Sequence, residues 1–151
     1  MRIETERLNI EIATIDEMEG YIAEQTDGEL LKAYREMLQG AKDNPEDYIW
    51  YAIWFIRLKN GKIVGDLSFK GLNSDGKVEI GYGVIEKERD KGYATEAVKA
   101  ATEWALNQPK VKAVEAETEP NNEKSQRVLK KCGFVFSGDF GEEGPRFFKM
   151  R

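Results

Sequence analysis

The amino-acid sequence predicts an α+β fold, built as one domain around a mixed β-sheet. The first observation is a stretch in which alternating apolar residues at 77–85 predict a strand, and apolar residues spaced by three and four at 93–107 predict a helix. The second is a pair of turn signals, Asn60-Gly61 and Asp75-Gly76, which separate strand-like segments and predict antiparallel neighbours. The third is the length: 151 residues suffice for one domain with a sizeable core but not for two ordinary ones, so we expect a single domain at 1–151.

The individual elements follow from local signals, taken in chain order. Thr14 and Glu17 form a capping box for a first helix to about residue 24, Asp27 caps a second helix, and Pro45 ends it. Further helices are expected at 93–107 and 120–132, and the first of these carries the chain across to a parallel neighbour of the strand at 77–85. Strands are expected at 8–12, 48–58, 62–71, 77–85, 111–118, 134–136 and 146–150.

The composition excludes several classes of function. The net charge of −5 argues against general nucleic-acid binding and is compatible with a basic amine as substrate. The chain has no histidine, which excludes Ser-His-Asp and Cys-His catalysis and argues against a zinc site, so no metal is expected. The single Cys132 has no partner for an intrachain disulfide, which makes a cytoplasmic location the expected one. Neither a signal peptide nor an apolar run of about 18 residues is found, so no membrane segment is expected.

The loop before the helix at 93–107 has the features of an anion site. Gly92 allows a close approach of the backbone or a positive φ, and Arg89 and Lys91 add positive charge beside the turn. Unpaired N–H groups at the start of a helix, together with the helix dipole, favour an anion such as phosphate. The same residues are compatible with a plain strand-to-helix connection. Neither GxxxxGK(S/T) nor GxGxxG occurs here, so no nucleoside-triphosphate P-loop or dinucleotide fingerprint is predicted.

The segment Arg89-Asp90-Lys91-Gly92-Tyr93-Ala94, followed by Thr95-Glu96-Ala97, satisfies the pattern Q/R-x-x-G-x-G/A. At these residues the chain resembles the GNAT superfamily of acetyl-CoA-dependent N-acetyltransferases, in which this loop binds the pyrophosphate of coenzyme A through backbone N–H groups. Members often carry glycine where Asp90 stands, so the Asp90 side chain is expected to point away from the pyrophosphate. The resemblance implies acetyl-CoA as cofactor, bound by Val84, Ile85, Arg89, Asp90, Lys91, Gly92, Tyr93, Ala94 and Thr95.

A second segment, from Asn122 to Phe134, resembles the second motif of the same family, N-x-x-S/A followed by K-x-G-F. The resemblance implies that Asn122 contacts the pantetheine arm and that Ser125 lies near the thioester sulfur and acts in catalysis. From the residues alone, Asn122 is equally well a helix N-cap, and Ser125 a tolerated serine bonded to a backbone carbonyl. Leu129 stands where many members carry a tyrosine acid. Cys132 lies on the apolar stripe of this helix and is interpreted as a buried, inert thiol.

The opening Thr5-Glu6-Arg7-Leu8 resembles the start common in the GNAT subgroup related to ribosomal-protein N-terminal acetyltransferases. Together these resemblances cover nearly the whole chain. They imply a single GNAT-type domain at 1–151, with a mixed central sheet of six to seven strands and about four helices on both faces. Members of this subgroup are often homodimers, and the aromatic-rich residues 48–55 give the sequence a surface for such a contact.

The reaction expected from the resemblance is transfer of the acetyl group of acetyl-CoA to a primary amine by direct attack in a ternary complex. The amine belongs to a protein or peptide N-terminus or to a small molecule. An N-terminal amine, whose pKa lies near ~8, loses its proton more readily at neutral pH than a lysine-type amine near ~10.4. Two alternatives are a catalytically silent GNAT-fold module that binds acyl-CoA as a regulator, and an unrelated binder of nucleotide phosphates.

The candidate base is Glu79, acting through water, because it shares a strand face with Gly81 and Gly83, which leave that face open. Glu79 is equally compatible with an exposed strand carboxylate that has no role in the chemistry. Glu119 is the reserve candidate, at the end of the parallel strand. Tyr82 belongs to the other strand face and is expected in the core.

Overall fold

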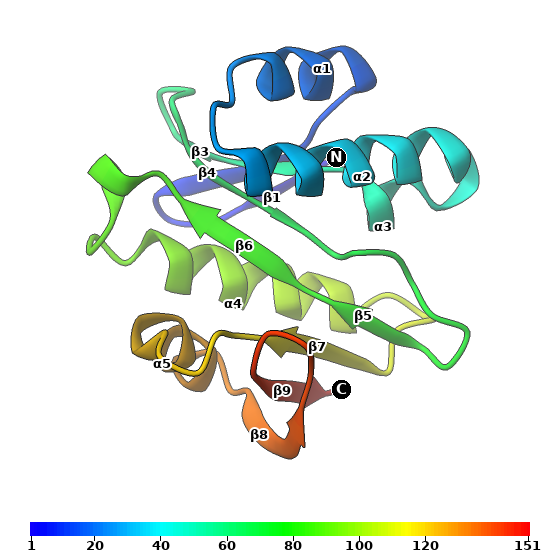
Figure 1. Ribbon diagram of the computed structural model, residues 1–151, viewed down its shortest axis with the longest axis vertical. Coiled ribbons are helices and arrows are strands. Elements are labelled where there is room, and N and C mark those ends of the chain that lie inside the picture. Colours follow the sequence, from blue (N-terminus) through cyan, green and yellow to red (C-terminus); the bar gives the residue numbers. More distant parts are fainter.

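The strands form two sheets that have no strand in common (Figure 1). The computed structural model describes every residue, Met1–Arg151. The first sheet is antiparallel, in the order β1 (Arg2–Glu4), β2 (Leu8–Ile12), β3 (Trp54–Leu58), β4 (Ile63–Ser68) and β6 (Gly81–Val84). The second has the order β5 (Lys77–Glu79), β7 (Ala113–Glu117), β9 (Pro145–Met150) and β8 (Val135–Phe140), with β5 and β7 parallel. The α+β class and the parallel pair are therefore confirmed.

The helices begin and end close to where the local signals place them. Thr14 Oγ1 accepts from Glu17 N, and the Glu17 side chain accepts from Thr14 N, so the capping box of α1 (Ile15–Ala23) is confirmed. Asp27 caps α2 (Gly28–Asp43), which ends before Pro45. The helix that connects β6 to β7 is α4 (Tyr93–Leu106), and α5 (Glu123–Lys131) follows β7. Short 3₁₀ turns occupy Pro45–Asp47 and Glu86–Glu88.

Two expected strands differ from the structure. Residues 48–58 begin as a short helix, α3 (Tyr48–Tyr51), which continues the turn started by Pro45, and only the second half is β3. The strand expected at 77–85 is broken at Ile80, because Ile80 N still donates to Glu115 O of β7 (2.8 Å) whereas the chain from Gly81 onward pairs with β4. This break and the additional strand β1 raise the strand number above the expected six to seven.

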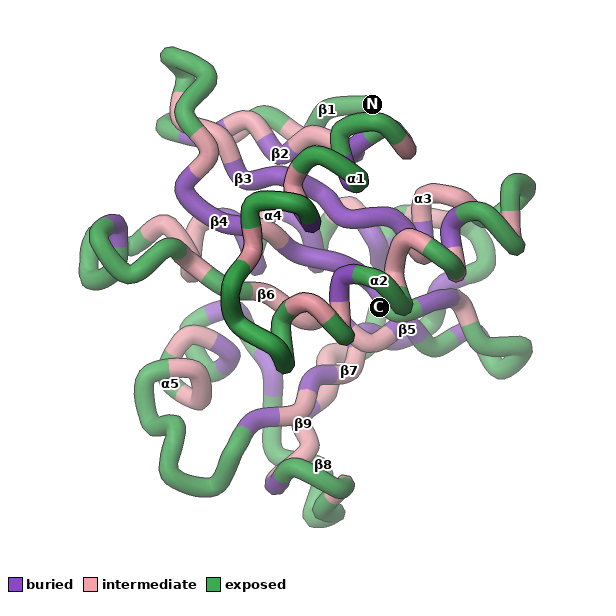
Figure 2. Tube along the Cα trace, turned by 45° about the horizontal axis from the view of Figure 1, so that its top comes forward, coloured by how far each residue is buried: buried purple, intermediate pink, exposed green.

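Helices cover both faces of the first sheet, as the alternation of apolar residues along β3 requires. Trp54 and Ile56 pack in the larger core with α4, whereas Phe55 packs in the smaller core with α1 and α2. Figure 2 shows that burial follows β3 and β4, while the outer turns of the helices are exposed. The aromatic residues of 48–55 are therefore largely interior, with Trp50, Trp54 and Phe55 at most 5% exposed, and only Tyr48 and Tyr51 keep partial exposure. None of the helices combines the length and apolar character needed to span a membrane.

Beyond Ile80 the two sheets separate, and this separation positions the site. On one side β6 pairs only with β4, in the register that runs from Ser68↔Gly81 to Gly65↔Val84. On the other side β7 leads through Thr118 to the start of α5. The second edge of β6 therefore has no partner strand and faces an opening between the sheets.

Candidate active site

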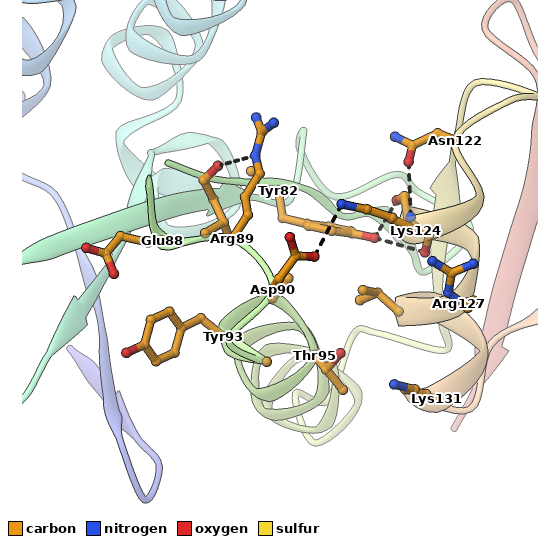
Figure 3. Close-up of a pocket in the computed structure, with 16 residues that line it drawn as sticks. Tyr82, Glu88, Arg89, Asp90, Tyr93, Thr95, Asn122, Lys124, Arg127 and Lys131 are labelled. Carbon is orange, nitrogen blue, oxygen red and sulfur yellow. Dashed lines mark hydrogen bonds and ion pairs between the residues drawn. The ribbon is translucent and has the colours of Figure 1, made fainter. Parts of the chain in front are cut away.

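A cavity of about 550 Å³ lies at this opening, between the start of α4 and α5 (Figure 3). Its floor is the unpaired edge of β6. The carbonyl of Val84 faces the opening, since it accepts a hydrogen bond from Arg89 Nε (3.1 Å). Because backbone groups alternate in direction along an antiparallel strand, the N–H and C=O groups of Tyr82 and Val84 point to this edge, while Ile85 N donates to Val64 O of β4 (2.8 Å).

The loop at the start of α4 presents free backbone donors to the cavity. Gly92, the N-cap, has φ 84°, and no side chain caps the helix. The first intrahelical donor is Glu96 N, bonded to Gly92 O (3.1 Å), so the N–H groups of Tyr93, Ala94 and Thr95 have no acceptor in the protein. Asp90 also has a left-handed conformation, with φ 65°. This explains why glycine suits the position of Asp90, and aspartate is one of the few other residues that tolerate such a φ.

A clamp from the N-terminal segment holds this loop in place. Arg7 Nε pairs with Glu96 Oε1 (2.7 Å), Arg7 Nη1 donates to Lys91 O (2.8 Å), and the guanidinium carbon lies 4.7 Å from the centre of the Tyr93 ring. Thr5 Oγ1 donates to Glu96 Oε2 (2.5 Å). The residues of the Thr5-Glu6-Arg7-Leu8 segment therefore contact the loop that the sequence singles out, although 84 positions separate Arg7 from Lys91. We call these contacts the Arg7 clamp.

Positive charge lines the wall of the cavity opposite the loop. Lys124, Arg127 and Lys131 recur at steps of three and four along α5 and so share one helix face. Figure 3 shows them across the opening from Asp90 and Thr95. Lys124 Nζ lies 3.2 Å from Asp90 Oδ1, an exposed ion pair that leaves the other two cations without an acidic partner. The cavity thus combines free N–H donors with the three cations of α5, and suits a polyanion.

A second cavity, of about 360 Å³, lies on the side of β6 that faces α2. Asp66 of β4 and Tyr34 of α2 contribute to its wall, with apolar side chains from α2 and carboxylates from the end of β7 and the β8–β9 turn. The two cavities have four wall residues in common, which are Tyr82, Gly83, Asn122 and Ser125. A ligand in the first cavity and a ligand in the second therefore meet at these residues.

Two hydroxyl groups lie where the cavities meet. Tyr82 Oη is 2.6 Å from Ser125 Oγ, and Asn122 Oδ1 accepts from Ser125 N (3.1 Å), which confirms Asn122 as the N-cap of α5 (Figure 3). Burial raises the pKa of Tyr82 to about 12, so this hydroxyl remains protonated at neutral pH. The interpretation of Tyr82 as a core residue is confirmed in part: it is partly buried and packs against the larger core, but it also lines the first cavity.

Two further residues of α5 have the expected environment. Leu129 is fully buried and supplies no acid. Cys132 is 3% exposed, and burial raises the pKa of its thiol to about 11, so the thiol stays protonated and inert, as predicted.

Glu79 lies outside the walls of both cavities. Its two oxygens accept from Arg146 Nη2 (2.7 Å) and Lys70 Nζ (2.9 Å). Burial alone would raise the pKa of Glu79, but these hydrogen bonds outweigh burial and lower it below its ordinary value. The reserve candidate, Glu119, is in the wall of the second cavity.

The structure brings most of the expected cofactor-binding residues together. Ile85 and Lys91 lie outside the first cavity, since Lys91 turns to Glu88 (Nζ to Oε2, 2.9 Å) and Ile85 is exposed. Sequence reasoning missed the cations of α5, whose spacing was visible, and the hydroxyl of Tyr82. The expected residues that line the first cavity are Val84, Arg89, Asp90, Gly92, Tyr93, Ala94, Thr95, Asn122 and Ser125.

The family model described as the acetyltransferase (GNAT) domain matches residues 4–135 of the chain. The chain belongs to the GNAT family. This GNAT domain is 37% identical over 86 residues to the uncharacterized N-acetyltransferase YjdG of Bacillus subtilis (strain 168), a match that covers 56% of this chain and 51% of YjdG. The chain thus spans about half the length of the curated relative it matches.

Solved structures share the fold of this GNAT domain. One is RimL, a ribosomal L7/L12 alpha-N-protein acetyltransferase in complex with coenzyme A, with a TM-score of 0.78, 14% identity and coverage of 99% of this chain and 98% of that one. Another is the spermidine N-acetyltransferase of Vibrio cholerae in complex with CoA and spermine, with a TM-score of 0.77, 12% identity and coverage of 97% and 96%. At these identities the likeness confirms the expected GNAT fold.

Proposed function

We propose that this protein is an acetyl-CoA-dependent N-acetyltransferase, which transfers an acetyl group to a primary amine by direct attack in a ternary complex. One observation carries the proposal: two cavities, one suited to a polyanion and one rich in carboxylates, meet at the Tyr82–Ser125 hydroxyl pair. Direct attack is favoured because the Ser125 and Tyr82 hydroxyls at this junction are bonded to each other and to no histidine or carboxylate that would activate either of them as an acetyl carrier. Cys132, the single thiol, is buried.

The residues of the first cavity fit coenzyme A. The free N–H groups of Tyr93, Ala94 and Thr95 suit the pyrophosphate, and Arg127 and Lys131 supply counter-charges for the phosphates. The free edge of β6 at Tyr82 and Val84 offers backbone groups to the amide groups of the pantetheine arm, as a partner strand would. The bound cofactor would supply the acetyl group as a thioester.

The junction residues have distinct tasks in this proposal. The N–H groups on the open edge of β6 stabilise negative charge on the acetyl oxygen. Ser125 and Tyr82 form a two-hydroxyl relay that donates a proton to the sulfur as the C–S bond breaks. A thiol resembling that of cysteine has a pKa near ~8.5, so its thiolate leaves tolerably well without help, and the loss for Ser125→Ala is expected to be modest.

The acceptor lies in the second cavity. Asp66, Glu117, Glu119 and Glu143 are in its wall, where Glu117 is paired with Arg146 and the one lysine, Lys70, is paired with Glu79. This balance favours a cationic amine, on a protein or peptide N-terminus or on a small molecule. Glu79 as base stays a prediction, although both of its oxygens are already engaged.

The proposal is tested by calorimetry with acetyl-CoA and by an acetylation assay with a panel of peptide amides and small amines. We expect Ser125→Ala to bind acetyl-CoA like the parent and to transfer the acetyl group more slowly. The control is Ser74→Ala, in an exposed turn. Binding of acetyl-CoA without transfer to any amine would favour the silent regulatory module. Thermal protection by ATP but not by coenzyme A would refute both readings.

The homodimer also stays a prediction, and the exposed apolar residues of β8 are the surface we propose for it. Val135, Phe136 and Phe140 of the edge strand β8 are 53%, 48% and 68% exposed. Light scattering at micromolar concentration distinguishes a dimer from a monomer of 17.3 kDa. A dimer that persists in Phe140→Ser would place the contact elsewhere.

A further inference from the structure

Asp66 is a partly buried carboxylate with one oxygen bound and the other free. Tyr21 Oη of α1 and Tyr34 Oη of α2 both donate to Asp66 Oδ2, at 2.8 and 2.6 Å. Oδ1 accepts no hydrogen bond from the protein and keeps some accessible surface, and Asp66 is in the wall of the second cavity. Two rigid donors therefore fix the carboxylate and leave one oxygen for a ligand.

There is free space between Asp66 and the residues that line both cavities. Asp66 lies directly opposite Gly83 in the register of β4 and β6, and Gly83 is in the wall of both cavities. A Cβ atom added at Gly83 would meet no atom within 4 Å, so there is room in front of this strand. A polar ligand in this space would give Asp66 Oδ1 the partner that the protein does not supply.

We propose that Asp66 binds the ammonium group of the acceptor in the second cavity and takes its proton before attack. This inference rests on the proposed acetyl transfer and names the residue that prepares the amine. It places the base on β4, anchored by two tyrosines, instead of at Glu79 on β5. Both oxygens of Glu79 accept hydrogen bonds, from Arg146 and Lys70, whereas Asp66 Oδ1 accepts none.

The proton balance of the step is simple. The ammonium group transfers one proton to Asp66 Oδ1, from which it passes to solvent. The neutral nitrogen then forms a bond to the acetyl carbonyl carbon, and the C–S bond breaks. The nitrogen then loses its second proton to solvent, the departing sulfur gains a proton from the Tyr82–Ser125 relay, and solvent returns one proton to the relay. Ammonium and acetyl-CoA thus yield the acetamide, coenzyme A with a free thiol, and one proton.

The surroundings keep Asp66 able to exchange a proton. Burial raises the pKa of Asp66, while the hydrogen bonds from Tyr34 and Tyr21 limit that rise. Burial also raises the pKa of both tyrosines, so they remain donors throughout the neutral range. The other charged groups in the wall of the cavity are Lys70, Glu117, Glu119 and Glu143.

The wall also limits the class of acceptor. Leu30, Ala33 and Met37 of α2 present apolar surface, which suits a carbon chain behind the ammonium group. The carboxylates of Glu119 and Glu143 have no hydrogen-bond partner in the protein, and they would repel an acceptor that carries a carboxylate beside its amine. The expected acceptor is therefore an amine on an aliphatic or peptide arm, and not a free α-amino acid.

The first test measures binding alone and does not require turnover. n-Butylammonium is titrated by NMR against the parent, Asp66→Asn and Asp139→Asn, with n-butanol as the uncharged probe. We expect Asp66→Asn to weaken butylammonium binding at least tenfold and to leave butanol unchanged. Asp139→Asn removes the same charge from the exposed strand β8 and should bind both probes like the parent. Equal binding of butylammonium by the parent and Asp66→Asn, or no binding by either, overturns the inference.

The second test measures butylammonium binding as a function of pH. If Asp66 had only a structural role, this pH profile would not shift between the variants. Butylammonium binding to the parent should weaken as the pH falls through the pKa of Asp66. Tyr34→Phe keeps the carboxylate, so it also serves if Asp66→Asn does not fold. Because the loss of this donor raises the pKa of Asp66, the weakening should move to higher pH in Tyr34→Phe. An unshifted profile contradicts the inference.

The third test separates this inference from the proposed function. With n-butylamine or a peptide amide as acceptor, kcat/KM should fall by ~10²–10⁴ in Asp66→Asn, the range for general acid–base groups, with acetyl-CoA affinity unchanged. A large loss in Glu79→Gln alongside a parental rate in Asp66→Asn assigns the base to Glu79 and overturns the inference. A parent that binds butylammonium through Asp66 but acetylates no amine refutes the proposed function and the proton transfer, and leaves the ammonium site standing.

Discussion

Gly92 is the position at which a single methyl group should disturb both the fold and the cofactor site. Its φ of 84° lies in the left-handed region, where an L-residue costs about 1–2 kcal/mol. The added Cβ would lie 3.2 Å from Arg7 Nη2, the flexible end of a side chain, so the strain is chiefly in the backbone. If the loop keeps its conformation in Gly92→Ala, this energy is lost from stability, and the melting temperature falls by ~2–8 °C for a chain of this length.

If the loop relaxes instead, the same energy is lost from cofactor binding. The N–H groups of Tyr93, Ala94 and Thr95 must then be brought back into place when coenzyme A binds, which weakens its affinity by about 5- to 30-fold. We therefore expect the loss of stability and the loss of binding free energy to sum to about 1–2 kcal/mol. A loss of stability alone, a loss of affinity alone, or any division of this energy between them agrees with strain at Gly92.

Urea denaturation and calorimetry with coenzyme A measure the two parts separately. The control is Gly20→Ala on the exposed side of α1, where the φ is helical and no atom lies near the added methyl group. That variant should gain up to about 1 kcal/mol, since alanine favours a helix interior over glycine. If Gly92→Ala matches the parent in both stability and affinity, neither the strained turn nor its task in anion binding can be upheld.

Three further predictions concern charge and packing. Lys131→Ala should weaken coenzyme A binding, and its difference in affinity from the parent should shrink between 0.1 and 1 M salt, because the screening length falls from ~10 to ~3 Å. The control Lys130→Ala, whose side chain is outside the cavity, should bind coenzyme A like the parent. Equal affinities of Lys131→Ala and the parent at low salt would remove Lys131 from the site. Leu129→Ala should destabilise the fold by about 2–5 kcal/mol in urea, because Leu129 is fully buried, and a loss below ~1 kcal/mol would contradict its place in the core. Glu79→Gln should destabilise the fold at pH 7, because a carboxylate whose pKa is lowered in the folded protein stabilises the fold above its ordinary pKa of 4.5. The difference in the free energy of unfolding between the variant and the parent should narrow as the pH falls below 4.5. A difference independent of pH would show that the ion pairs of Glu79 with Arg146 and Lys70 contribute nothing to stability.

Local signals predicted the parts of the fold that depend on neighbouring residues. The capping box at Thr14, the N-cap at Asp27 and the turn at Asp75-Gly76 each involve residues close in sequence, and the structure confirms them. The break of the strand at Ile80 could not be predicted in this way. It depends on a choice between two partners, β4, which precedes it in the chain, and β7, which follows only after α4.

The candidate site likewise has one part that neighbouring residues predict and another that depends on contacts between distant residues. The anion loop was visible because its glycine, its charges and its helix start are consecutive. Tyr82 was assigned to the core because strand alternation predicts which face a side chain takes, but not that α5 would bring Ser125 within 2.6 Å of its hydroxyl. Asp66 gave no signal at all, since one carboxylate in an apolar strand becomes informative only when Tyr21 and Tyr34 converge on it from two helices.

The Arg7 clamp means that the loop at 89–94 is not a transferable module. Its left-handed residues, Asp90 and Gly92, are stabilised by contacts of Lys91, Tyr93 and Glu96 with Arg7, which lies 84 positions before Lys91. A peptide that spans the loop and α4 would lack this support, and the loop grafted onto another scaffold would lose its shape unless the opening residues came with it. A protein engineer who wants the anion site would have to transplant two pieces of chain.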